Sequence, residues 1–242
     1  MSEPHASRLA PHASLRISII TLFPEVFAPW LEASIVGKAV EKGLVRFRLV
    51  QLRDFTHDRH NTVDDYPYGG GAGMVLKPEP FFEAVESLGP PDGPVVLCSA
   101  RGRRFAHRDA VKWSMEREVT LLCGHYKDVD QRVAEGLATD EVSVGDFVLT
   151  GGEPAALCIV DAMVRLLPGA LGDHESASAD SFYDGLLSPP SYTRPQEYRG
   201  RSVPEVLRSG NHAQIEAWRQ AEAERLTRER RPDLWDAHDA EA

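Results

Sequence analysis

The segment SVGDFVLTGGEPAALCIVDAMVRLLPGALG, residues 143–172, contains the strongest fold signal in the chain. Apolar residues in its first part predict a short β-strand: Val144, Phe147, Val148 and Leu149. That strand must end at Gly151-Gly152, because glycine has no side chain to pack and readily adopts left-handed backbone conformations. Pro154 suits the first turn of a helix, and residues at helical spacing follow it: Leu157, Asp161, Val164 and Arg165. The segment therefore predicts a strand, a tight turn and a helix.

A strand that enters a helix through a glycine turn surrounds an open crevice with backbone N–H groups. Such a crevice suits a nucleotide-like ligand. An ordinary connection between a strand and a helix has the same pattern, however. This segment alone does not distinguish the two interpretations.

Four further segments predict strands: residues 16–23, 45–52, 95–99 and 119–123. Residues 45–52 alternate between apolar and polar, whereas the other three are apolar runs typical of strands covered on both faces. Pro24-Glu25 opens a predicted helix after the first strand, and helical patterns lie between the later strands. This order predicts an α/β fold with a mostly parallel sheet and helices on its faces.

The composition indicates a cytoplasmic enzyme with a substantial core. The chain has 242 residues, of which 42% are hydrophobic and 26% charged. No apolar run is long enough for a membrane helix, and residues 1–14 lack the apolar core of a signal peptide, which predicts a disordered leader. Cys98, Cys123 and Cys158 lie in apolar contexts without CxxC spacing, which predicts three buried, reduced thiols.

Beyond Gly172 the composition changes to small and polar residues, which predicts a flexible linker over residues 172–182. Residues 15–171 would then form the α/β domain and residues 183–242 a C-terminal helical domain. Asn211 is a predicted helix cap with Gln214 reaching back to it, and the helical pattern after it continues to Pro232.

The net charge of −10 argues against a nucleic-acid partner, but the charges are unevenly distributed. Residues 99–117 contain six basic and two acidic side chains, and residues 194–231 contain nine arginines and six glutamates. Arg194, Arg208 and Arg219 are candidates for phosphate contacts. A solvated surface would account for either basic segment as well.

Residues 53–74 form a predicted loop that is longer than a connection requires. Its 22 residues include two histidines, four aspartates and four glycines. The glycines do not match the dinucleotide-binding fingerprint, so a phosphate cradle or a mobile cover is the functional interpretation. His57 and His60 alone are a weak indication of a metal site.

Six strings are more specific than any of these patterns: RDFTHDRHNTVDD, YGGGAGM, CGHYKDVDQRV, SVGDFVLTGGEPA, DSFYDGLLSPPSYTRP and LRSGNHAQIEAWR. In this order they resemble the bacterial tRNA (guanine-N1)-methyltransferase family, TrmD, over residues 15–231. The resemblance implies a SPOUT-class α/β domain tied in a deep trefoil knot, an exception to the rule that chains do not thread loops. It also implies a homodimer and a small helical domain at the C-terminus.

The resemblance further implies that S-adenosylmethionine binds at three loops, residues 97–102, 123–126 and 144–152. The residues carried over as cofactor-binding are Leu97, Ser99, Gly124, Tyr126, Val144, Gly145, Asp146, Phe147, Val148, Leu149, Gly151 and Gly152. Glycines in these loops would allow the backbone to approach the ligand closely. The chain departs from the family at three places: His125 replaces a common arginine, Lys127-Asp128 replaces a Glu-Gly pair, and Ala100 replaces a frequent proline.

Methyl transfer to N1 of guanine needs a base at N1 and a cation or hydrogen-bond donor at O6. The resemblance implies that Asp180 is the base, acting across the dimer interface, and that Arg165 stabilises O6. From the residues alone, Asp180 could equally be a helix cap or a solvated acid, and Arg165 could pair with Asp161.

The implied substrate is tRNA, methylated at the guanosine of position 37 beside the anticodon, with Mg²⁺ required for activity. The implied RNA-binding residues are Asp64, Arg194 and His212.

Two other functions are alternatives. The first is a SPOUT enzyme that methylates another RNA or a ribose hydroxyl, which the YTRP and SGNHAQIEAWR strings disfavour because they resemble the anticodon-stem-binding domain. The second is a non-catalytic RNA-binding relative, which the presence of Asp180 and of the glycine pair disfavours.

Overall fold

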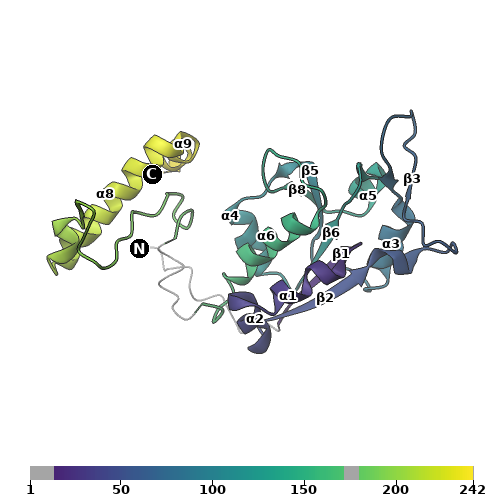
Figure 1. The fold of residues 1–242 in the computed structure, drawn as a ribbon, viewed down its shortest axis with the longest axis horizontal. Coiled ribbons are helices and arrows are strands. Elements are labelled where there is room, and N and C mark those ends of the chain that lie inside the picture. The colour runs from purple at the N-terminus through teal and green to yellow at the C-terminus, as the bar shows by residue number, and fades with distance from the viewer. Residues whose placement is uncertain (1–13, 172–179, 242) are drawn as a thin grey trace. The chain divides into compact units, whose positions relative to one another are not determined.

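The computed structural model describes residues 14–171 and 180–241 (Figure 1). The predicted leader, apart from Ser14, and the predicted linker as far as residue 179 lie outside these residues. Contacts between Cα atoms divide the chain into two compact units, Met1–Gly172 and Asp173–Ala242, which are described separately here. None of the helices in the described residues is both long and apolar enough to cross a membrane.

The first unit is built on a parallel five-stranded sheet with the strand order β2-β1-β6-β5-β8. Its strands are β1 (Leu15–Thr21), β2 (Val45–Gln51), β5 (Val95–Arg104), β6 (Glu118–Cys123) and β8 (Asp140–Ser143). All four pairings are parallel, with β1 aligned from Leu15 opposite Val45 to Thr21 opposite Gln51. The predicted α/β class, the mostly parallel sheet and the four strands predicted outside residues 143–172 are confirmed.

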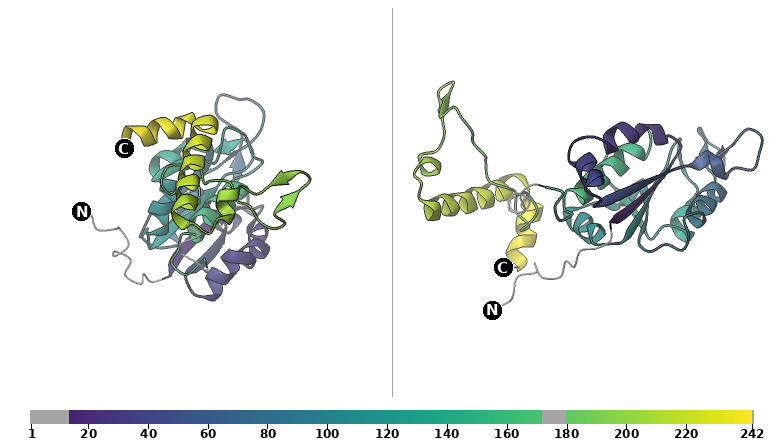
Figure 2. Two further views of the ribbon diagram at one scale, coloured as in Figure 1. Left: turned by 90° about the vertical axis from the view of Figure 1, so that its left-hand side faces the viewer. Right: turned by 90° about the horizontal axis from the view of Figure 1, so that it is seen from below.

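Helices cover both faces of this sheet (Figure 2). They are α1 (Ala28–Leu31), α2 (Ser34–Glu41), α3 (Pro78–Glu86), α4 (His107–Ser114), α5 (Gln131–Gly136) and α6 (Glu153–Val164). Alternate residues of the central strands point to opposite faces. Leu121 therefore belongs to the core cluster that includes residues of α1, α2, α4 and α6, whereas Leu122 belongs to the cluster that includes residues of α3 and α5.

The long loop after β2 contributes a second, smaller sheet. The 3₁₀ helix η3 (Leu52–Phe55) is followed by β3 (Asp64–Asp65) and β4 (Val75–Leu76), and β4 also pairs in parallel with β7 (Asp128–Val129). Because β4 pairs with β7, the loop that contains the glycine run between β3 and β4 is anchored to the segment that follows β6. A second 3₁₀ helix, η2 (Pro24–Val26), lies between β1 and α1, where the sequence predicts a helix start.

The strand predicted within residues 144–149 is wrong. Strand β8 ends at Ser143, and the backbone leaves the sheet before Val144. Phe147 and Val148 are 56% and 87% exposed. β8 lies at the edge of the sheet and pairs only with β5, as far as Ser143. The apolar residues after Ser143 therefore have no strand pairing that would keep them in the sheet. The predicted helix is present as α6, although Arg165 caps its end instead of lying within it.

In residues 180–241 the second unit contains a hairpin, a 3₁₀ helix and two α-helices. The hairpin pairs β9 (Glu197–Tyr198) with β10 (Arg201–Ser202), and η4 (Glu205–Arg208), α8 (His212–Arg230) and α9 (Pro232–Glu241) follow. The side chain of Asn211 accepts a hydrogen bond from the Gln214 backbone N–H at 3.3 Å, as predicted for the cap of α8. Helix α8 ends directly before Pro232, also as predicted.

One of the three cysteines contradicts the prediction of buried thiols. Cys98 and Cys123 are buried in adjacent strands, but Cys158 is exposed, because it lies on the outer side of α6. Burial raises the pKa of the Cys123 thiol well above its usual value, and its neighbour Cys98 raises it further. Only the deprotonated thiolate is nucleophilic.

We predict that a maleimide labels Cys158 rapidly in the native protein, whereas Cys98 and Cys123 react only after denaturation. Mass spectrometry of tryptic peptides would identify the modified residues. Cys158→Ser should remove the fast phase without changing the slow one. Rapid native labelling of Cys123 would contradict the burial described here.

Candidate active site

A pocket of about 280 Å³ is lined by residues of the three predicted cofactor loops, near the carboxyl ends of β6 and β8. Three separate segments form its walls: residues 97–101 within β5, residues 124–129 after β6, and residues 142–152 from the end of β8 to α6. In α/β proteins this edge of a parallel sheet is where ligands bind. The three loops that the sequence predicts to act together do lie around one pocket.

Most of the predicted cofactor-binding residues line this pocket. They are Leu97, Ser99, Gly124, Tyr126, Val144, Phe147, Val148, Leu149, Gly151 and Gly152. Gly145 and Asp146 do not belong to the lining. Asp146 instead accepts a hydrogen bond from Arg104 at 2.7 Å, and a Cβ on Gly145 would meet the Phe147 ring. These two residues therefore contribute to the conformation of the loop without lining the pocket.

An interruption of strand β5 forms the first wall. Its register with β8 shifts between Cys98 and Arg103, so the intervening residues bulge away from the ladder. Gly102 allows the strand to rejoin β8, since a Cβ there would overlap the backbone of Glu141 and Val142. The bulge places Ser99, Ala100 and Arg101 in the pocket wall.

The second wall is held in an unusual backbone conformation. Tyr126 has a φ of 59°, in the left-handed region that residues other than glycine rarely adopt. Its hydroxyl lies 3.5 Å from Arg53 Nη2, and the backbone N–H of Lys127 donates to the Met74 carbonyl at 3.0 Å. Contacts from the 53–74 loop therefore hold this turn in place.

The glycine pair joins the second wall to the third. The Gly152 N–H donates to the Gly124 carbonyl at 2.8 Å, and His125 forms an isolated bridge with Gly151. Gly152 has φ −77° and neither glycine has a positive φ, so a left-handed turn is not the reason for glycine here. The reason is close packing: a Cβ on Gly152 would lie 2.7 Å from Cys123 Cα and 2.9 Å from Gly124 N.

A buried carboxylate lies directly behind the glycine pair. Glu153, 5% exposed, is the first residue of α6, where the partial positive charge of the helix N-terminus favours an acid. It accepts a hydrogen bond from Thr21 Oγ1 at 2.7 Å, and its other oxygen lies 4.0 Å from His125 Nε2. The His125 ring also packs against Phe23, with centroids 4.9 Å apart. The His125 side chain thus lies against Glu153 of α6 and against Phe23 of the segment that follows β1.

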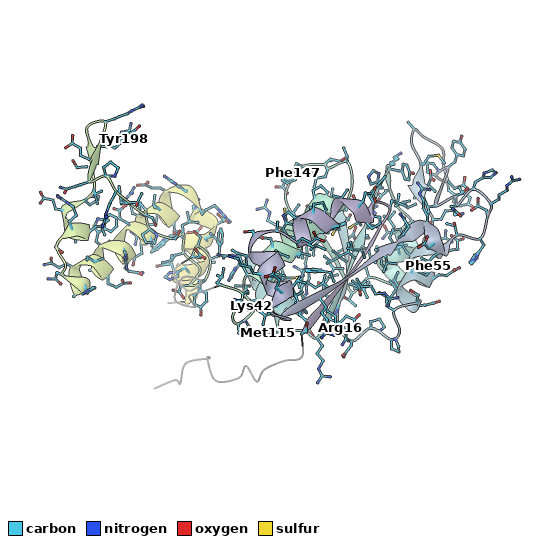
Figure 3. The ribbon with its side chains drawn as sticks, turned by 60° about the horizontal axis from the view of Figure 1, so that its bottom comes forward. Arg16, Lys42, Phe55, Met115, Phe147 and Tyr198 are labelled. Atoms are coloured by element: carbon cyan, nitrogen blue, oxygen red, sulfur yellow. The ribbon has the colours of Figure 1, made fainter. Side chains whose placement is uncertain are left out.

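The third wall is apolar and exposed. Phe147, Val148 and Leu149 line the pocket, and each is at least 40% exposed (Figure 3 labels Phe147). Backbone groups and apolar side chains dominate this wall, which suits the adenosine part of a nucleoside ligand.

The predicted catalytic residues lie in different units. Arg165 is half-buried at the C-terminal end of α6, the helix whose first turn borders the pocket. Asp180 is exposed in the second unit and borders another pocket there, with Asp184, Glu216 and Arg219 among its lining residues. The predicted RNA-binding residues are Asp64 in β3, Arg194 before β9, and His212 at the start of α8. These three residues do not border the first pocket.

Comparison with known proteins identifies the family. A family model described as tRNA (Guanine-1)-methyltransferase TrmD matches residues 15–237. The chain belongs to the TrmD family. Curated relatives named tRNA (guanine-N(1)-)-methyltransferase include those of Dehalococcoides mccartyi strain 195, 52% identical over 91% of this chain and 90% of the relative, and Bacillus subtilis strain 168, 52% identical over 93% of both. That of Brevibacillus brevis is 54% identical over 91% of both chains.

Sequence reasoning missed several residues at the pocket. Thr150 and Ala155 line it, and Thr21 with Glu153 supports it from behind. Thr21 comes from β1, more than a hundred residues away in the chain, so no local pattern connects it to this site. Glu153 follows the glycine pair directly, and an acid in the first turn of a helix is a signal that was available.

We predict that Gly152→Ala destabilises the fold by roughly 1–3 kcal/mol, because the added Cβ overlaps backbone that cannot move independently. Gly151→Ala is the matched comparison: its Cβ meets the ends of the Glu153 and His125 side chains, which can rotate away. Thermal unfolding of both variants measures the difference. Equal melting temperatures for the two variants would contradict the packing argument.

Proposed function

We propose that this TrmD-family chain transfers a methyl group from S-adenosylmethionine to N1 of the guanosine at position 37, beside the anticodon of tRNA. The relatives named above are tRNA (guanine-N(1)-)-methyltransferases and match the chain along nearly its whole length. The observation that carries the proposal is the convergence of three distant loops on one pocket, with the glycine pair joining two of them.

The residues around the pocket fit S-adenosylmethionine. Its apolar third wall and the backbone groups of residues 124–126 and 151–152 would hold the adenosine part, while charged side chains are confined to the opposite side, at Arg101, Lys127 and Asp128. When bound, the cofactor supplies an electrophilic methyl group on a sulfonium. All other steps belong to the protein's own side chains.

In the proposed mechanism Asp180 accepts the proton of guanine N1, which is protonated at neutral pH and cannot otherwise act as a nucleophile. Arg165 donates to O6, where negative charge develops as the proton leaves. Arg165 lies at the opposite end of α6 from the glycine pair, so its support comes from the family resemblance. Support for Asp180 comes from the family resemblance and from its exposure to solvent.

The same proposal includes a homodimer in which Asp180 of one subunit serves the pocket of the other, the trefoil knot of the SPOUT class, and a cytoplasmic location. Mg²⁺ is also expected from the resemblance. Within residues 14–171 and 180–241, no group of three histidine, cysteine, aspartate or glutamate side chains is arranged to hold a metal ion. We therefore assign no Mg²⁺ ligands and derive no step through the ion.

The tRNA would contact arginines whose charge is not already neutralised. In α8, Arg219, Arg225 and Arg228 each lie 2.6–3.5 Å from a glutamate one turn away. Arginines in the preceding segment have no ion-pair partner within the described residues: Arg194, Arg199, Arg201 and Arg208. Arg199 lies over the ring of the exposed Tyr198 in the hairpin, 5.2 Å from its centroid (Figure 3 labels Tyr198). This segment is therefore a better candidate for phosphate contacts than α8. Arg219 is accordingly the weakest candidate among the three arginines that were predicted to contact phosphate.

We predict that Asp180→Asn lowers turnover by at least about 10²-fold while S-adenosylmethionine binding is unchanged, because asparagine keeps the size but cannot accept the proton. Single-turnover methylation of purified tRNA measures the first quantity and calorimetry the second. A primer-extension stop beside the anticodon identifies the methylated position and separates this function from that of another SPOUT enzyme.

Mixed dimers test the assignment across subunits. Asp180→Ala subunits are combined with subunits that carry Leu149→Asp in the exposed apolar wall of the pocket. The mixture should regain part of the activity, since one of the two sites in each heterodimer has an intact pocket from one chain and an intact Asp180 from the other. An Asp180→Asn protein with near-normal turnover, or inactive mixed dimers, would remove Asp180 from the role of base.

We predict that Arg194→Gln and Arg208→Gln each reduce the slope of log affinity for tRNA against log salt by about 0.7–0.9, the contribution of one phosphate contact. Arg219→Gln and Arg225→Gln serve as controls and should leave the slope nearly unchanged, because glutamates already neutralise these arginines. Filter binding over a range of KCl concentrations measures the slope. Equal slopes for all four variants would contradict this placement.

A further inference from the structure

Two basic side chains, Arg101 and Lys127, line the pocket, and their surroundings differ. Arg101 Nη2 lies 3.3 Å from Asp128 Oδ1, and its Nε lies 3.9 Å from Glu141 Oε1. Lys127 also lines the pocket but has no ion-pair partner anywhere in residues 14–171 or 180–241. The charge of Arg101 is therefore already compensated, whereas that of Lys127 is available to a ligand.

The side chain of Lys127 is supported along its length. Its neighbour Asp128 pairs with Val75 in the small sheet, which fixes the backbone at this point. The stem packs on the glycine run: Lys127 Cβ and Cδ lie 3.2 and 3.5 Å from where a Cβ of Gly73 would be. The Nζ atom lies 3.4 Å from the corresponding position of Gly71. Glycine at these positions leaves room for the stem, so less side-chain entropy is lost when the ammonium group binds a ligand.

An uncompensated, supported cation in a pocket wall favours an anionic group on the ligand. S-adenosylmethionine has a single anionic group at neutral pH, the α-carboxylate of its methionine part, beside a cationic ammonium and a cationic sulfonium. We propose that Lys127 binds this carboxylate and thereby orients the methionine end of the cofactor. The inference rests on the proposed function, because it assumes that S-adenosylmethionine occupies this pocket.

The sign of the charge makes the inference specific to this chain. The family commonly has an acid at the position of Lys127, and an acid would attract the ammonium group and repel the carboxylate. With lysine here and Arg101 paired to acids, the lining of the pocket includes a basic residue without an ion-pair partner in the described residues, in place of an acid. We therefore expect the affinity of this protein to depend on the carboxylate.

Decarboxylated S-adenosylmethionine tests the proposal, because it lacks only that group. The experiment compares its dissociation constant with that of S-adenosylmethionine by calorimetry. In the full-length wild-type protein, loss of the carboxylate should weaken binding about tenfold, as expected for a partly exposed charge-assisted hydrogen bond. In Lys127→Met, which keeps the stem on the glycine run, the two ligands should bind within about twofold of each other.

Two variants serve as controls. Lys127→Arg keeps the charge and should retain most of the tenfold difference between the ligands. Lys38→Met removes an exposed lysine of α2 that does not border the pocket, and should behave as the wild type.

An equal effect of decarboxylation in the wild type and in Lys127→Met would overturn the role of Lys127 while leaving the pocket assignment intact. The same holds if Lys127→Met weakens only tRNA binding and its salt dependence, since the cation would then serve a phosphate. Failure of the wild type to bind S-adenosylmethionine at all would overturn the pocket assignment and this inference together.

Discussion

The structure depends on the close approach between the end of β6 and the start of α6. Gly152 lies against Cys123 and Gly124 at a distance that leaves no room for a Cβ, and its N–H donates to the Gly124 carbonyl. Because the two backbones are in contact, the loop after β6 and the loop before α6 become a single wall. The buried Glu153 continues this contact to Thr21 in β1. The pocket is therefore a product of backbone packing at one point, with side chains added around it.

The electrostatics of the molecule explain how an acidic protein can serve an RNA substrate. The net charge is −10, yet many acids are paired with arginines nearby, as in Arg103 with Asp109 and Asp140, and Arg104 with Asp146. The cations that are available to bind a phosphate or a carboxylate are those without an acidic partner in the described residues. In the second unit these are concentrated around the hairpin β9–β10, and in the pocket the remaining cation is Lys127.

The loop of residues 53–74 acquires a physical role from this arrangement. It supports the pocket through Arg53 against Tyr126, Met74 against the backbone of Lys127, and the glycine run against the lysine stem. Its histidines do not converge on a metal site: His57 Nε2 lies 2.8 Å from Glu83.

The sequence alone determined the parallel α/β class, the positions of four strands, the start of α6 and the cap of α8. These features follow from local signals, since apolar runs, proline and glycine positions and capping residues act within a few residues of themselves. The three loops that line the pocket were implied by the family resemblance instead. Tertiary structure decided that β8 ends at Ser143, that Cys158 is exposed, and that close packing, not a left-handed turn, requires Gly152. It also decided that Arg103 pairs with Asp140 and Arg104 with Asp146, and it added Thr21 to the site. Each of these depends on which distant segment lies alongside, and neighbours brought together by the fold leave no mark in the local pattern.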